Sequence, residues 1–265
     1  MKIYKICLLF GVLLVASIFT YVSFMYVYTD HMFAPIVPLE PPHTEFSSQG
    51  WKAPLTPFIH KVNTPERAHR KEKKFNGFEV DVLSYQGNLL AAHDPTEATR
   101  NISLADIFAT VKHPQQKIWW LDVKGELTDA EIEDILQLAK QYAIPTEHLL
   151  FEVSPGPTAK RIKQKHLSHL LPLPDGFDQD QNNPAVRAQL NATLLALLEE
   201  YQPQAISASF GKYAYLKTYF PNAPKAIYYS ATQRPSIKKL FMRQHMEKDP
   251  SVKIFMTDEY NWVNL

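Results

Sequence analysis

The sequence has almost no cysteine and almost no excess charge. Cys7 is the only cysteine among 265 residues, so no disulfide can form within the chain and no zinc site can be built from cysteine ligands. A protein without disulfides can lie on either side of a membrane. The formal net charge is +1, whereas proteins that bind nucleic acid usually carry a strongly basic face. The sequence therefore predicts no nucleic-acid partner.

Charged side chains are also missing from residues 6–28, a run that matches the roughly 20 apolar residues needed to cross the hydrocarbon layer of a membrane. Lys2 and Lys5 precede this run and Asp30 follows it. Positive charge on the N-terminal side predicts that the remainder of the chain lies on the extracytoplasmic side, periplasmic or extracellular. We expect a single-pass membrane anchor over residues 1–30. A cleaved signal peptide is the alternative, although the apolar run is long for one.

Two segments of different character follow the expected anchor. Residues 31–57 carry several prolines and no apolar periodicity, which is typical of an extended linker. Across residues 58–265, short apolar or β-branched runs alternate with amphipathic stretches, the pattern of a parallel sheet with helical crossovers. The expected strands cover 57–62, 77–85, 117–124, 148–154, 168–173, 204–210, 225–231 and 252–258. Their number predicts a single (β/α)8 barrel, with a doubly wound open sheet as the alternative.

Acidic side chains lie on two of the expected strands. Glu79 and Asp81 are two residues apart and therefore share one face of the strand 77–85. Buried carboxylates need a compensating positive charge, and Mg²⁺ or Ca²⁺ prefers oxygen ligands; the alternative is a solvent-facing pair on an edge strand. Asp122 and Lys124 repeat the spacing at the end of the next strand. Asp122 can complete a metal site and Lys124 can contact a phosphate, or the two can simply form a salt bridge.

Two histidines are expected at the same end of the sheet. His60 ends the first strand, and His93 ends a short additional strand over residues 88–94. Two histidines on either side of a phosphodiester can act as general base and general acid. Trp120 shares the strand face of Asp122, which makes it a candidate substrate contact, with core packing as the alternative.

These motifs resemble the phospholipase C-like phosphodiesterase superfamily of TIM barrels, which includes glycerophosphodiester phosphodiesterases, sphingomyelinase D and menorin-like proteins. The motifs are HKVN at 60–63, EVD at 79–81, HD at 93–94 and LDVK at 121–124. The resemblance implies that His60 and His93 are the acid/base pair and that Lys124 contacts phosphate. It also implies one divalent cation, Mg²⁺ or Ca²⁺, held by Glu79, Asp81 and Asp122. The C-terminal MTDEYNW resembles a segment that borders the substrate in these families, which makes Trp262 a further substrate contact.

The resemblance implies metal-dependent cleavage of a glycerophosphodiester or of a (lyso)phospholipid head group, close to the membrane that the N-terminal helix enters. It leaves the subfamily open. Lys61 and Asn63 stand where glycerophosphodiester phosphodiesterases usually carry other residues, and Asp94 replaces a glycine of sphingomyelinase D. Glu152 lies where some relatives place another acidic residue, and a salt bridge with Lys124 is its alternative role. The competing hypothesis is a non-catalytic binding or signalling domain on the same barrel.

Overall fold

The structure is a computed structural model that describes residues 2–33, 56–174, 177, 183–229 and 237–257. Its strands are β1 (Thr56–Ile59), β2 (Gly77–Tyr85), β3 (Asn88–Leu90), β4 (Ile118–Lys124), β5 (Leu149–Glu152), β6 (His169–Pro172), β7 (Ala205–Ser209), β8 (Lys225–Tyr228) and β9 (Val252–Thr257). The α-helices are α1 (Lys2–Phe33), α2 (Pro65–Lys71), α3 (Pro95–Ala98), α4 (Leu104–Thr110), α5 (Asp129–Gln141), α6 (Pro157–Gln164), α7 (Pro184–Tyr201), α8 (Tyr213–Tyr219) and α9 (Ile237–Lys248). Short 3₁₀ turns cover Pro114–Gln116, Thr146–His148 and Phe210–Lys212.

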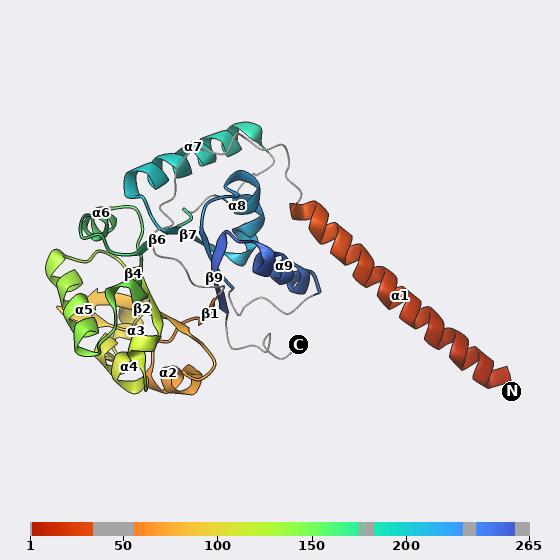
Figure 1. The fold of residues 1–265 in the computed structure, drawn as a ribbon, viewed down its shortest axis with the longest axis horizontal. Helices are drawn as coiled ribbons and strands as arrows, with labels where there is room; N and C mark the ends of the chain where they lie inside the picture. Colours follow the sequence, from red (N-terminus) through yellow and green to blue (C-terminus); the bar gives the residue numbers. More distant parts are fainter. Residues whose placement is uncertain (1, 34–55, 175–176, 178–182, 230–236, 258–265) are drawn as a thin grey trace.

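The sheet closes on itself. β1 pairs in parallel with β9 on one side and with β2 on the other, and the remaining pairs run in the order β9-β8-β7-β6-β5-β4-β2. The eight parallel strands β1, β2 and β4 to β9 thus form a ring, with helices around it (Figure 1). Because an open sheet would leave β1 with one neighbour, the doubly wound alternative is wrong and the predicted (β/α)8 barrel is confirmed. β3 is antiparallel to β2 and lies outside the ring.

Alternation along the strands separates two apolar layers. Outward residues such as Phe78 and Trp119 pack against the helices, and the Trp119 ring lies 4.5 Å from the Phe108 ring of α4. Inward residues form a separate cluster to which the ring strands other than β2 contribute: Phe58, Trp120, Leu150, Leu170, Ala205, Ala226, Ile254 and Met256. The barrel interior is therefore filled by side chains, and a ligand can only be bound at one end of it.

Local capping signals in the sequence mark where several helices begin. Ser103 with Asp106 and Thr128 with Glu131 each form a complete capping box at the starts of α4 and α5. Thr64 accepts a hydrogen bond from the backbone N–H of Arg67 at the start of α2. Side chains that accept from these otherwise unpaired N–H groups fix where a helix begins. Within the described residues, each expected strand lies within a few residues of its predicted bounds.

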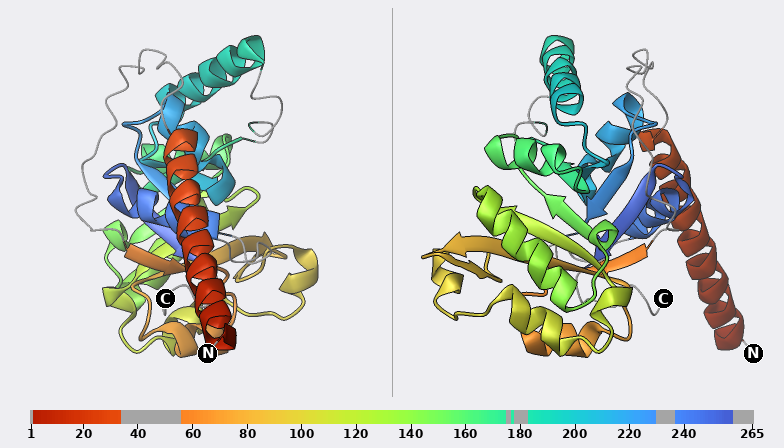
Figure 2. Two further views of the ribbon diagram at one scale, coloured as in Figure 1. Left: turned by 90° about the vertical axis from the view of Figure 1, so that its right-hand side faces the viewer. Right: turned by 60° about the vertical axis from the view of Figure 1, so that its left-hand side comes forward.

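The N-terminal helix α1 extends away from the barrel (Figures 1 and 2). It continues to Phe33, three residues past the predicted end of the anchor at residue 30. Its residues Phe10–Val27 are long and apolar enough to cross a membrane, a property that signal sequences near an N-terminus share. Near its C-terminal end, the ring of Tyr26 lies 5.5 Å from Phe241 and 6.3 Å from His245, both on α9.

Candidate active site

The candidate site lies at the carboxyl ends of the parallel strands, where the inward-facing residues become polar. Glu79 and Asp81 point into the barrel from β2 while Phe78, Val80 and Val82 pack outward, as predicted. The parallel register sets Asp81 beside Asp122 of β4, and Asp122 beside Glu152 of β5. Three neighbouring strands therefore each bring carboxylates to one end of the barrel, the end at which (β/α)8 enzymes bind their substrates.

The three predicted metal ligands converge. One carboxylate oxygen from each of Glu79, Asp81 and Asp122 lies within 4.8 Å of the others. Glu79 and Asp81 are each only 1% exposed. Burial, followed by repulsion from Asp81 and Asp122, raises the pKa of the Glu79 carboxyl well above its usual value. Burial likewise raises the pKa of Asp122, against the attraction of Lys124.

This donor set fits a hard divalent cation. Glu79 Oε1 is buried and accepts no hydrogen bond from any residue that the structure describes. An unpaired buried carboxylate oxygen costs free energy unless a donor or a cation satisfies it. Clustered carboxylate oxygens are the ligands that Mg²⁺ and Ca²⁺ prefer. Glu79, Asp81 and Asp122 therefore suit such an ion, although the residues alone do not choose between the two metals.

Lys124 pairs with two of these carboxylates. Its Nζ lies 3.0 Å from Asp81 Oδ1 and 2.5 Å from Asp122 Oδ2. Burial acts to lower the pKa of Lys124, but the carboxylates of Asp122 and Asp81 outweigh burial and raise the pKa above its usual value. Lys124 thus carries a fixed positive charge at the mouth of the barrel, and the salt bridge that the sequence left as an alternative is present.

The two histidines face the same cavity. His60 follows β1, and its Nε2 lies 3.8 Å from Glu79 Oε2. The imidazole of His60 also stacks on the ring of Tyr228, with centroids 6.4 Å apart and planes 18° apart. His93 comes from the loop after β3, where its backbone N–H donates to Glu97 Oε2 at 3.0 Å. Because β3 runs antiparallel to β2, the chain turns back and places His93 at the mouth of the barrel.

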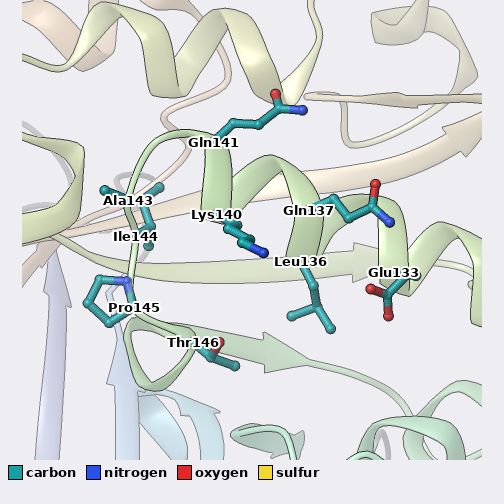
Figure 3. Close-up of a pocket in the computed structure, with 9 residues that line it drawn as sticks. All are labelled: Glu133, Leu136, Gln137, Lys140, Gln141, Ala143, Ile144, Pro145 and Thr146. Carbon is teal, nitrogen blue, oxygen red and sulfur yellow. The ribbon is translucent and has the colours of Figure 1, made fainter.

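The cavity has a volume of about 240 Å³. All the predicted catalytic and metal-binding residues line it, together with Lys124 and four further residues. The lining residues are His60, Lys61, Glu79, Asp81, His93, Asp122, Lys124, Glu152, Tyr228 and Met256. A second hollow of about 910 Å³ lies along α5 and the connection from α5 to β5 (Figure 3). It contains none of the predicted site residues.

Trp120 lies elsewhere than predicted. Its side chain is fully buried in the barrel interior beside Phe58, and it is absent from the described lining of the cavity. Its Nε1 donates to Glu152 Oε2 at 2.6 Å, and Ser207 Oγ donates to Glu152 Oε1 at 2.5 Å. Trp120 thus packs in the core, the alternative that the sequence left open, and its indole N–H is hydrogen-bonded to Glu152. The salt bridge with Lys124, which the sequence left as an alternative role for Glu152, is not among the ion pairs of the described residues.

Comparison with solved structures finds several similar chains. The structure is similar to a glycerophosphodiester phosphodiesterase from Parabacteroides distasonis, with 12% identity over 77% of this chain and 92% of that one, at a TM-score of 0.47. It is similar to a phosphoribosyl anthranilate isomerase from Thermococcus kodakaraensis, with 12% identity over 77% of this chain and 88% of that one, at a TM-score of 0.47. It is also similar to a dihydropteroate synthase from Xanthomonas albilineans, with 8% identity over 77% of this chain and 87% of that one, at a TM-score of 0.44.

These three proteins catalyse different reactions on one fold, and their low identities and TM-scores carry no argument about activity. No family model matches the chain, and no curated protein matches its sequence. The barrel itself rests on the strand pairing described above. Any choice of activity therefore rests on the residues of the site.

Besides the predicted site residues, four others belong to the site; of these, the sequence had already singled out Glu152 as a further acidic residue. Asn63, Glu152, Ser207 and Tyr228 contact predicted site residues. Asn63 belongs to the HKVN motif, and its place in that motif was the signal that could have identified it. Ser207 carried no such signal, because it comes from β7 and contacts Glu152 across the barrel. Trp262 and Asp258 lie outside the described residues, and Trp262 stays a prediction.

Proposed function

We propose that this protein cleaves phosphodiesters with the help of one divalent cation. The observation that carries the proposal is the meeting of three carboxylates, two histidines and one lysine around a single cavity. These groups come from four segments, namely the end of β1, β2, the loop after β3, and β4, and together they supply what the reaction needs. A cation site alone would fit many functions, whereas two histidines flanking it are suited to proton transfer to and from a phosphodiester.

Each group of residues would have a separate role in the reaction. Glu79, Asp81 and Asp122 would hold the cation, which would neutralise the charge of the phosphate when bound and orient it for in-line displacement. Lys124 would add a fixed positive charge for a second phosphate oxygen. One of His60 and His93 would remove the proton of the attacking hydroxyl or water, and the other would protonate the leaving oxygen.

His60 and His93 are held differently, which bears on their roles. His60 lies close to the Glu79 carboxylate and against the ring of Tyr228. His93 has a more exposed side chain, 47% accessible, and its Nδ1 lies 3.8 Å from Asp94 Oδ2. Because His60 belongs to the buried end of the cavity and His93 to its rim, a substrate between them would present one side of its phosphate to each histidine. Which of the two is the base follows from how the substrate enters.

The substrate class follows from the site and from the N-terminal helix. A cavity of about 240 Å³ accommodates a phosphate with a small head group and leaves the rest of the molecule outside. We propose a glycerophosphodiester or the head group of a (lyso)phospholipid as substrate, with Trp262 contacting it. The helix α1 would anchor the protein in a membrane by a single pass, with the barrel on the extracytoplasmic side.

The first experiment is turnover by the full chain in detergent, on glycerophosphodiesters and on choline and ethanolamine lysophospholipids, with Mg²⁺, Ca²⁺ or a chelator. Wild type is compared with His60→Ala and His93→Ala, and with His69→Ala as the matched control, since His69 is 70% exposed on α2. We expect metal-dependent turnover whose rate falls by about 10²–10⁴-fold in the two site variants and is unchanged in His69→Ala.

The alternative function is a binding or signalling domain on the same barrel. No turnover on any substrate, while calorimetry still detects metal and glycerophosphodiester binding, would favour that alternative. Absence of both turnover and metal binding would reject the proposed metal site as well. Turnover that persists in both histidine variants would reject the acid/base pair and leave the metal site as the sole source of activity.

A further inference from the structure

Lys61 has an unusual backbone conformation directly after the candidate catalytic residue His60. Its φ is +55°, in the left-handed region that residues other than glycine rarely adopt. Asparagine and glycine enter this region most easily, and β-branched residues least easily. Strained conformations of this kind persist where the surrounding structure holds them, and they concentrate at functional sites.

The turn at Lys61 is held from both sides. Before it, the carbonyl oxygen of His60 accepts a hydrogen bond from Arg67 Nη2 at 2.8 Å. After it, the backbone N–H of Val62 donates to the carbonyl oxygen of Glu79 at 2.8 Å. These two contacts tie the turn to α2 and to β2, so the conformation of Lys61 is part of the packing between β1 and its neighbour.

The left-handed turn directs the backbone N–H of Lys61 at the carboxylate of Glu79. This N–H donates to Glu79 Oε2, the same oxygen that lies 3.8 Å from His60 Nε2. The other oxygen, Oε1, receives no hydrogen bond from the described residues, and the Glu79 side chain is only 1% exposed. One oxygen is thus fixed by the turn while the second is left for a ligand.

We propose that Lys61 is a positioning residue whose backbone conformation, and not its ammonium group, sets Glu79 for the cation. With Oε2 held by the Lys61 N–H, rotation of the Glu79 carboxylate is blocked and Oε1 stays with the Asp81 and Asp122 oxygens, within 4.8 Å of them. The same turn also fixes the backbone directly after His60, the first residue of the HKVN motif. The inference rests on the proposed metal site and names the element that organises it.

The proposal predicts that metal affinity follows the ease of a left-handed backbone at position 61. The variants are Lys61→Gly and Lys61→Asn, which favour that conformation but lack the charge, Lys61→Ala, and Lys61→Val, which disfavours it. Gln202→Val is the matched control, because Gln202 has a φ of +49° at the end of α7, at the opposite end of the barrel from the cavity. Each full-length variant in detergent is titrated with Ca²⁺ and with Mg²⁺ by calorimetry, beside its circular dichroism melt.

For Lys61→Gly and Lys61→Asn, we expect metal dissociation constants within about threefold of the wild-type value. For Lys61→Val, we expect a dissociation constant about tenfold higher. Lys61→Ala should lie between them, so the series remains informative even if Lys61→Val does not fold. Gln202→Val should lower the melting temperature and leave metal affinity unchanged.

Two results would overturn the proposal while leaving the metal site intact. In one, Lys61→Asn loses as much affinity as Lys61→Val, which would assign the effect to the ammonium group. In the other, all four variants bind as wild type does, which would show that Glu79 needs no such support. No binding of either ion by wild type would instead reject the proposed metal site, and this inference with it.

Discussion

Asn63, in the loop after β1, and Asp81 of β2 are joined by two reciprocal hydrogen bonds. Asn63 Nδ2 donates to Asp81 Oδ2 at 2.6 Å, and Asn63 Oδ1 accepts from the Asp81 backbone N–H at 3.0 Å. Asn63 is 8% exposed and Asp81 is 1% exposed. One side chain therefore fixes both the backbone and the carboxylate of a candidate metal ligand, in addition to the hold that the turn at Lys61 has on Glu79.

We predict that Asn63→Ala weakens metal binding and destabilises the barrel. The substitution leaves a buried carboxylate oxygen and a backbone N–H without partners, at an expected cost of about 1.5–3 kcal/mol in the free energy of unfolding. Calorimetry with Ca²⁺ and denaturant unfolding measure the two effects. Asn191→Ala is the control, since Asn191 is buried and accepts from Tyr215 Oη away from the site. If both variants bind Ca²⁺ equally well, Asn63 has no role in the site.

Gly77 gives a second prediction, about the closing of the barrel. A Cβ at this position would collide with the ring of Phe58, which is fully buried in the barrel interior and cannot move aside. Gly77→Ala should therefore destabilise the protein by about 1–3 kcal/mol through overpacking. Gly211→Ala is the control, because a Cβ there meets no atom within 4 Å. Equal denaturation midpoints for the two variants would contradict the close approach of β1 and β2.

The sequence predicted the barrel and the inward carboxylates because both follow from short-range patterns. Strand alternation with a period of two determines that Glu79 and Asp81 share a face, and the same period separates Trp119 from Trp120. Once the strands are parallel, their carboxyl ends meet at one end of the barrel. The predicted convergence of Glu79, Asp81 and Asp122 therefore needed no knowledge of distant contacts.

Alternation does not tell how far a side chain lies from the mouth, and here the prediction for Trp120 differs from the structure. Trp120 faces inward as expected, but Glu152 from the next strand lies at the cavity and takes the indole N–H. The contact between Ser207 and Glu152 joins residues 55 positions apart. Such contacts depend on which strands the ring brings together, which no local pattern contains.

Glu152 should make stability depend on pH. Burial, followed by the charge of Asp122, raises the pKa of Glu152 to about 8, above its value in an unfolded chain. The folded state then holds a proton that the unfolded state releases, so the unfolding free energy falls as pH rises from about 4.5 to about 8, by roughly 1.4 kcal/mol for each unit of pKa shift.

The test is Glu152→Gln, which can still accept from Trp120 and donate to Ser207. Denaturant unfolding of wild type and variant at pH 5 and at pH 8.5, both in chelator, gives the difference between them. The variant should gain stability relative to wild type at pH 8.5 and not at pH 5. An equal difference at the two pH values would mean that Glu152 is ionised throughout.

Lys124 should stabilise the protein without metal and oppose the binding of metal. Its ammonium neutralises Asp81 and Asp122, and these are two of the carboxylates that a cation would need. In Lys124→Met the apo protein loses this compensation, so its melting temperature in chelator should fall. A divalent cation then meets two carboxylates that are not neutralised by an ammonium group, so the rise in melting temperature on adding Ca²⁺ should exceed that of wild type.

Turnover separates this effect from loss of the phosphate contact. If Lys124 also binds the substrate phosphate, Lys124→Met combines tighter metal binding with a lower kcat/KM, a pair of changes that simple unfolding cannot produce. Lys160→Met is the control, since Lys160 pairs with Glu200 on the outside of the barrel. A smaller Ca²⁺-dependent rise in Lys124→Met than in wild type would indicate that Lys124 organises the carboxylates for the ion instead of competing with it.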